Sequence, residues 1–141
     1  MISLDVFRLL DLYGINYFEK IKDELSDDDY WTILRALWID HGVCNRQWMD
    51  LIYCDRKRSH KIMKSSDRQI LRRLPKKVKA YRVSYPDSND FYKFNWTLNL
   101  DFALKYKYFR PNAFIEEKII DKRNIFAYFN SRGEKEILLK R

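Results

Sequence analysis

The spacing of apolar residues changes near Pro75, and this change constrains the fold class more than any other feature of the chain. Before Pro75, apolar residues recur every three or four positions, which is typical of amphipathic helices. Residues 78–85 and 115–129 instead show the alternation that is typical of strands. The sequence therefore predicts an α+β protein, with a helical part over residues 1–75 and a β-rich part over residues 76–141. The helical half is expected to pack on a small β-sheet, so that both parts form one compact domain.

Four or five helices are expected before Pro75, because start and stop signals divide the helical pattern. Gly14 breaks the first run, and Gly42 is expected to end the third helix in a left-handed conformation. The helix that begins at Asn45 is expected to continue through the basic run 56–58. The other predicted starts are Asn16 with Glu19, the acidic run 27–29, and a capping box at residues 66–69.

The β-rich part contains three short motifs that place polar side chains on or beside strands. The first lies inside an alternating strand, and the second is a short strand followed by a helix that Asn99 caps. The third opens the last predicted strand, where a period of two would put both of its glutamates on one side. In order, the motifs are Tyr81-Arg82, Asn95-Trp96-Thr97 and Glu134-Lys135-Glu136.

In this order, the three motifs resemble those of the ADP-ribosyltransferase family, in the class with an arginine, a Ser/Thr strand motif and a Glu-x-Glu. In that family a first strand carries Tyr-Arg, a second carries Ser-Trp-Thr before a helix, and a late strand supplies the catalytic glutamate. The resemblance covers residues 78–139 and departs from the family pattern at two positions. Asn95 stands where the family usually has Ser, and Val83 replaces a common Gly. The resemblance implies a split β-sheet of the ADP-ribosyltransferase type and NAD as a substrate.

The resemblance also implies a role for each matched residue in binding NAD. Arg82, with Tyr81 before it, would bind the pyrophosphate, because a guanidinium can form paired hydrogen bonds to phosphate oxygens. Asn95, Trp96 and Thr97 would seat the nicotinamide ribose. Asn95 retains the ability to donate a hydrogen bond to a carboxylate, since its amide has two donors.

The two glutamates of the last motif would carry the chemistry. The resemblance implies that Glu136 hydrogen-bonds the ribose 2′-hydroxyl and stabilises the oxocarbenium as nicotinamide leaves, while Glu134 orients the nucleophile. Each motif also has an ordinary structural interpretation. Arg82 would then be an exposed strand arginine or part of an ion pair, the glutamates a solvated strand edge, and Trp96 a core residue.

The positive charge of the chain is concentrated in one segment. Residues 1–54 carry 5 basic and 10 acidic side chains, residues 55–79 carry 11 and 2, and residues 80–141 carry 12 and 8. The middle segment is either a solvated helix face or a surface for nucleic acid or an acidic partner. The residues predicted for this surface are Arg56, Lys57, Arg58, Lys61, Arg72 and Arg73.

Neither a metal site nor a membrane span is expected. His41, Cys44, Cys54 and His60 do not follow a usual zinc-finger spacing. Two cysteines suit a reducing compartment, and the start of the chain lacks the features of a signal peptide. We therefore expect a cytoplasmic protein.

The expected function is transfer of ADP-ribose from NAD to a macromolecule, by a phage-encoded effector that acts on a protein of its bacterial host. The alternative is a protein that kept the fold, lost catalysis through the changes at Asn95 and Val83, and binds its target. Such a protein would inhibit a nucleic-acid-handling complex of the host through the basic segment, residues 55–79.

Overall fold

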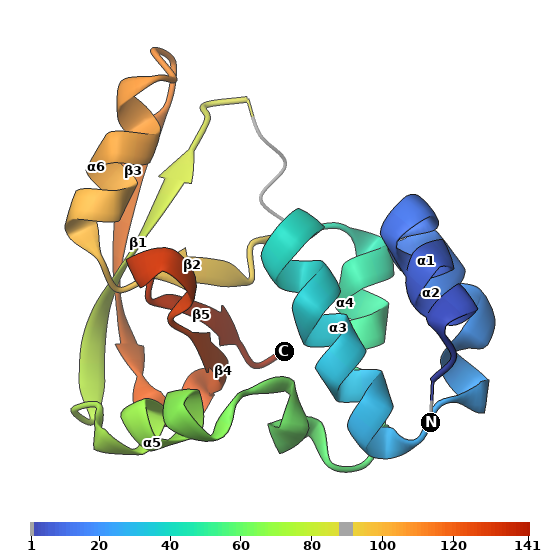
Figure 1. The fold of residues 1–141 in the computed structure, drawn as a ribbon. Helices are drawn as coiled ribbons and strands as arrows, with labels where there is room; N and C mark the ends of the chain where they lie inside the picture. Colours follow the sequence, from blue (N-terminus) through green and yellow to red (C-terminus); the bar gives the residue numbers. More distant parts are fainter. Residues whose placement is uncertain (1, 88–91) are drawn as a thin grey trace. The chain divides into compact units, whose positions relative to one another are not determined.

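The computed structural model describes residues 2–87 and 92–141, which form six α-helices and one sheet of five strands (Figure 1). The helices are α1 (Leu4–Tyr13), α2 (Ile15–Ile21), α3 (Asp27–His41), α4 (Arg46–Ile52), α5 (Ser65–Arg73) and α6 (Leu100–Tyr108). The strands are β1 (Lys77–Ser84), β2 (Asn95–Thr97), β3 (Phe114–Asp121), β4 (Ile125–Phe129) and β5 (Glu136–Leu139). The predicted α+β class is confirmed.

The chain divides into two compact units. Unit 1 consists of Met1–Val43 and Asp55–Ile62, and unit 2 consists of Cys44–Cys54 and Met63–Arg141. Unit 1 therefore contains α1, α2 and α3, whereas unit 2 contains the other three helices and the whole sheet. This division does not follow the predicted boundary at Pro75, because α4 and α5 are grouped with the strands.

Unit 1 is built around the aromatic side chains of α3. Ser26 caps this helix by accepting a hydrogen bond at Oγ from the Asp29 N–H over 3.1 Å. The acidic run 27–29 occupies the first turn, as predicted, where negative charge is favourable. Trp31 and Trp38 are buried in the core of this unit.

Two glycines of unit 1 behave differently from the prediction. Gly14, at φ +57°, both ends α1 and caps α2, so the predicted helix start at Asn16 is wrong. Gly42 ends α3 but has a φ of −63°, so the predicted left-handed conformation is also wrong. Gly42 is needed for space instead, because a β-carbon there would lie 2.3 Å from Cε3 of Trp38.

Helix α4 begins as predicted but is shorter. Asn45 caps it by accepting a hydrogen bond from the Trp48 N–H over 2.9 Å. The helix then ends before the basic run 56–58, which lies in an irregular segment. The predicted extension through this run is wrong, because Arg58 has a φ of +65° that no α-helix accommodates.

Helix α5 starts one residue before the predicted capping box at residues 66–69. Lys64 holds the N-cap position and provides no side-chain cap, so the box prediction is wrong. Asp67, expected inside the box, is instead a buried residue of the first turn, where its carboxylate suits the positive helix end. The helix ends ahead of Pro75, as predicted.

The strands form an antiparallel sheet in the order β3-β1-β2-β5-β4 (Figure 1). β1 and β3 pair along their whole length, whereas β1 and β2 pair only where Tyr81 lies opposite Thr97. A short 3₁₀ helix, Lys122–Asn124, separates β3 from β4. Residues 86–90, whose Pro-Asp-Ser-Asn-Asp composition is typical of a turn, lie largely outside the described residues. β1 and β2, which join the two halves of the sheet, are thus connected by a single residue pair.

Both faces of the sheet are covered around β5. Ile137 and Leu138 are neighbours that point to opposite faces, and both are fully buried. α4 is tied to this strand, because the Tyr53 hydroxyl that follows it donates to the Leu139 carbonyl. Trp48 of α4 is also buried.

Candidate functional site

The three strands that carry the sequence motifs are neighbours in the sheet. β2 lies between β1 and β5, so Tyr81-Arg82, Asn95-Trp96-Thr97 and Glu136 come from adjacent strands. Tyr81 lies opposite Thr97, and Thr97 lies opposite Glu136. Because directly opposed residues project to the same side, these three side chains share one face of the sheet.

Arg82 is bound to the first residue of β2. Its Nη1 donates to the Asn95 carbonyl oxygen over 2.7 Å and also to Asn95 Oδ1. Its Nε is buried and has no hydrogen-bond partner among the described residues. Glu116, opposite Arg82 on β3, is paired with Lys93 at 2.7 Å.

The guanidinium of Arg82 is therefore held in place by hydrogen bonds to Asn95. Within residues 2–87 and 92–141, no ion pair of Arg82 is found, so the structural interpretation of Arg82 as half of an ion pair is not supported. A partly buried guanidinium that makes no direct ion pair can take an anionic ligand as a further hydrogen-bond partner.

Asn95 connects Arg82 to Glu136. Its Nδ2 donates to Glu136 Oε2 over 3.3 Å, while its Oδ1 accepts from Arg82. This orientation of the amide is the electrostatically favourable one, since the oxygen meets the cation and the NH₂ group meets the carboxylate. The prediction that Asn95 can donate to a carboxylate is confirmed. The two ends of one amide thus hold two opposite charges.

Cys44, which is not among the predicted site residues, also contacts this amide. Its Sγ lies 2.8 Å from Asn95 Oδ1 and 4.0 Å from Arg82 Nη1. Cys44 directly precedes Asn45, the cap of α4, and α4 belongs to the same unit as the sheet. No local sequence signal indicates this contact, because 51 positions separate Cys44 from Asn95.

Glu134 lies outside the last strand, which corrects the prediction for the third motif. β5 begins at Glu136, Glu134 has helical backbone angles, and Lys135 has a φ of +48°. The alternation that was expected to place Glu134 and Glu136 on the same side of one strand therefore does not apply. A single residue with positive φ turns the chain between the two carboxylates.

This turn is held by the end of β2 and the start of α6. Thr97 Oγ1 donates to the Glu134 carbonyl and accepts from the Asn99 N–H over 3.0 Å. The Asn99 side chain donates to the Gly133 carbonyl over 2.9 Å and, as predicted, caps α6 by accepting from the Phe102 N–H over 3.3 Å. Residues at the end of β2 and before α6 thus fix the turn that leads into Glu136.

Trp96 packs beneath the site. It is buried, and as the neighbour of Thr97 in β2 it projects to the opposite face of the sheet. Lys118 Nζ lies 5.7 Å from the centre of its ring, a cation–π distance. Its Nε1 has no hydrogen-bond partner among the described residues. Trp96 is therefore a core residue that supports the strand and does not share a face with Glu136.

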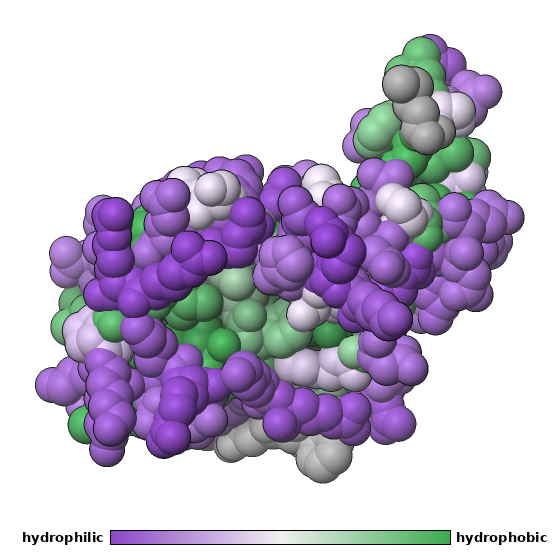
Figure 2. Space-filling view, turned by 90° about the horizontal axis from the view of Figure 1, so that it is seen from below, coloured by the Kyte–Doolittle hydropathy of each residue, from purple (hydrophilic) through white to green (hydrophobic). Residues whose placement is uncertain are grey.

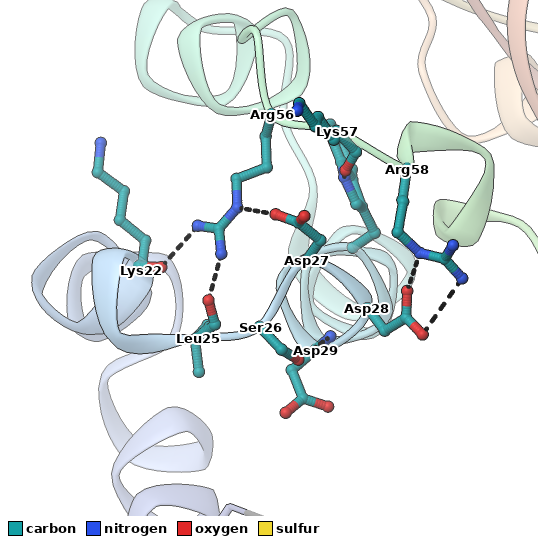
Figure 3. Close-up of polar contacts among 10 residues, drawn as sticks. Lys22, Leu25, Ser26, Asp27, Asp28, Asp29, Arg56, Lys57 and Arg58 are labelled. Carbon is teal, nitrogen blue, oxygen red and sulfur yellow. Dashed lines mark hydrogen bonds and ion pairs between the residues drawn. The ribbon is translucent and has the colours of Figure 1, made fainter.

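Arg56, predicted for a partner surface, is bound within unit 1 (Figure 3). Its Nε donates to Asp27 Oδ1 over 2.7 Å, and its other nitrogens donate to the carbonyls of Lys22 and Leu25. Its guanidinium also lies 4.8 Å from the centre of the Tyr30 ring. The Arg56 side chain fastens the start of α3, and it is only 21% exposed.

Arg58 is bound to the next aspartate of α3 (Figure 3). Its Nε lies 2.6 Å from Asp28 Oδ1, and this hydrogen bond is the main cause that lowers the pKa of Asp28. Lys57, between the two arginines, accepts a hydrogen bond at its carbonyl from Trp31 Nε1 over 2.8 Å, while its side chain is exposed. Lys61 is half-buried in the same unit.

The remaining basic residues belong to unit 2. Arg72 and Arg73 are exposed at the end of α5, where a positive charge suits the helix dipole. Lys122 joins them from beyond β3, since its Nζ donates to the Arg72 carbonyl over 2.7 Å. Figure 2 views the structure from the side on which α5 lies in Figure 1, and hydrophilic residues cover most of the visible face. The basic segment is thus divided between two units, and two of its arginines are held by their own unit.

The described residues contain no group of His, Cys, Asp or Glu side chains that could hold a metal ion. Neither Cys44 nor Cys54 forms a disulfide bond in the part of the chain that the structure describes. Within the same residues, no helix combines the length and the apolar character required to cross a membrane. Comparison with family models, with curated proteins and with solved structures gave no match to this chain.

Proposed function

We propose that this protein transfers ADP-ribose from NAD to a macromolecular target, as a phage effector acting on a host protein. One observation carries the proposal. The amide of Asn95 joins Arg82 and Glu136, and the three residues come from three adjacent strands. These are the positions at which the motifs resemble those of ADP-ribosyltransferases, and nothing in the motifs themselves required the three strands to be neighbours.

The donor set fits the anionic part of NAD. Arg82 offers a buried Nε that has no hydrogen-bond partner among the described residues, and its guanidinium makes no direct ion pair there. A pyrophosphate would satisfy both the orphaned donor and the charge. Tyr81 and Thr97, on the face that Glu136 shares, provide polar groups beside the carboxylate. NAD supplies an N-glycosidic bond whose cleavage releases nicotinamide.

Glu136 is proposed to act on the charge that develops at the ribose. Asn95 holds its carboxylate at 3.3 Å, so the negative charge is fixed before a substrate arrives. A fixed charge stabilises a developing positive centre without reorganisation during the reaction. Glu134 is proposed to orient the nucleophile from the turn before β5, since Thr97 fixes its backbone there. The nucleophile forms the new bond to the ribose and loses its proton, while the bonding pair of the broken bond leaves with nicotinamide.

The sheet is proposed to be of the split type that the resemblance implies. The single pairing between Tyr81 and Thr97 supports this, because the strands on either side of it pair much more extensively. Val83, which stands where the family has a common Gly, is half-buried in β1 next to Arg82. Because neighbours along a strand project to opposite faces, the Val83 side chain does not lie on the face of Arg82.

The proposal is tested by thermal melting and by nicotinamide release. A ligand that binds only the folded state stabilises it by about 2.7 kcal/mol at a hundredfold excess over its Kd. NAD should raise the melting temperature, and Arg82→Ala should abolish the shift. Arg8→Ala, which removes an exposed arginine of α1, is the matched control and should leave the shift intact. Absence of any shift at millimolar NAD would contradict the proposal.

A second candidate function is that of an inactive relative that binds its target through basic residues. The exposure of Arg72 and Arg73 favours it, whereas the internal bonds of Arg56 and Arg58 weigh against a surface over the whole segment. The test asks whether the protein inhibits its host target without transferring label from NAD to it. A protein that blocks its host target but transfers no label from NAD, and that loses the block with Arg72→Ala and Arg73→Ala, would establish this function instead.

A further inference from the structure

The end of α6 exposes aromatic rings among basic side chains. Tyr108 is 81% exposed and Phe109 is 78% exposed, which is exceptional for residues of their size. The sequence interleaves them with cations, as Lys105-Tyr106-Lys107-Tyr108-Phe109-Arg110, a segment that we call the α6 tip. No carboxylate occurs between residues 102 and 115, so the charge of this segment is uniformly positive.

The rings of the α6 tip are arranged to offer separate faces. The centres of the Tyr108 and Phe109 rings lie 5.1 Å apart with an angle of 88° between their planes. Two perpendicular rings do not make one flat apolar patch, which a folded protein partner would cover. Each can instead receive a planar group on its own face.

Arg110 is already ordered in this segment. Its guanidinium lies 3.5 Å from the centre of the Tyr106 ring, and its Nη1 donates to the Tyr106 carbonyl over 2.8 Å. A cation held in this way loses little conformational freedom when it contacts an anion. Lys105, the residue before Tyr106 in α6, is exposed.

We propose that the α6 tip binds single-stranded nucleic acid. Exposed aromatic side chains that stack with bases, next to cations that contact the backbone, are the combination that single-stranded nucleic acids require. A base pair in a duplex is already stacked on both sides, so single strands fit the rings better than duplexes do. A polyanion that carries planar groups matches both the positive charge and the exposed rings of the α6 tip. This inference does not depend on the proposed reaction with NAD.

The test measures binding of fluorescein-labelled dT20 and rU20 to the whole protein by fluorescence anisotropy, without NAD. Both should bind at 50 mM salt, and the affinity should fall with salt with a logarithmic slope of about −2, as expected when roughly three phosphates are neutralised. The double variant Tyr108→Ala, Phe109→Ala should weaken binding roughly fivefold to a hundredfold per ring. The exchange Tyr108→Phe, Phe109→Tyr keeps both rings and should retain binding.

Two further variants separate the α6 tip from other surfaces. Tyr13→Ala removes a tyrosine of α1 that is 63% exposed and should change nothing. Lys105→Ala with Lys107→Ala should flatten the salt dependence, whereas Arg72→Ala with Arg73→Ala should not.

Three results would overturn the inference. The first is that neither oligonucleotide binds at low salt. The second is that binding survives the loss of both rings but is lost with Arg72 and Arg73. The third is that polyglutamate competes as well as unlabelled dT20 at equal charge, which would assign the tip to an acidic protein partner.

Discussion

The Asn95 side chain lies between two opposite charges, with its Oδ1 on Arg82 and its Nδ2 3.3 Å from Glu136. Asn95→Asp would keep the size of the side chain but place a second carboxylate next to Glu136. Like charges at this distance resist joint ionisation, so the variant should lose the thermal shift that NAD is expected to produce. Asn95→Ser restores the residue that the resembled family uses and should keep the shift. An Asn95→Asp protein that responds to NAD like the parent would show that the orientation of the amide is irrelevant to binding.

The charge of Glu136 should matter to the rate more than to affinity. Glu136→Gln keeps size and one oxygen but removes the negative charge, so nicotinamide release should slow on the order of a hundred- to a thousandfold while NAD affinity changes little. Glu134→Gln should reduce labelling of the target and spare some hydrolysis of NAD, because its proposed role concerns the nucleophile. Both activities can be measured on the same samples. Full labelling of the target by Glu136→Gln would refute the proposal that Glu136 acts on the charge developing at the ribose.

Arg56 should contribute to stability and not to partner binding. Arg56→Ala leaves Asp27 and two carbonyls of the segment before α3 without their donor. Hydrogen bonds to charged groups that are partly buried contribute about 1–3 kcal/mol, so the midpoint of chemical denaturation should fall accordingly. Lys57→Ala, at an exposed neighbour, should change the free energy of unfolding by less than about 0.5 kcal/mol. Equal effects of the two substitutions would contradict the contacts in Figure 3.

Asp121 should titrate far below its usual range. The hydrogen bond from the Arg123 side chain is the largest cause that lowers its pKa from 3.8 to about 2. Because the folded-state pKa is the lower one, the associated stability is present above about pH 4 and is lost as the pH falls towards 2. Carbon-detected NMR of the carboxyl groups would measure this pKa. Arg123→Ala should raise it, and should leave the pKa of Asp28, which Arg58 lowers, unchanged.

The sequence predicted local structure well where local chemistry decides it. Asn45 and Asn99 cap their helices as expected, because a cap depends on residues three positions away. The period change near Pro75 correctly separated α1 to α5 from the strands. The order of the three motifs along the chain also agreed with their placement on adjacent strands.

The failures concern long-range contacts. The basic run 56–58 has helical composition, but Arg56 and Arg58 are bound to aspartates 29 and 30 positions earlier in the chain, and these bonds prevail over helix propensity. Glu134 looked like a strand residue because nothing nearby reveals that Thr97 fixes its carbonyl in a turn. Cys44 was missed for the same reason, since its contact with Asn95 exists only after folding.

β5 is an inner strand of the sheet although it follows the other four in the chain. The ribosome synthesises proteins from the N-terminus, so β2 and β4 emerge while the place between them is still empty. Until residues 136–139 have been added, both strands present unpaired backbone edges, and Asn95 lacks the carboxylate to which it donates. The cluster of Arg82, Asn95 and Glu136 is therefore completed only when translation reaches β5. Shorter nascent chains would be both incompetent in the proposed reaction and exposed to wrong strand pairing.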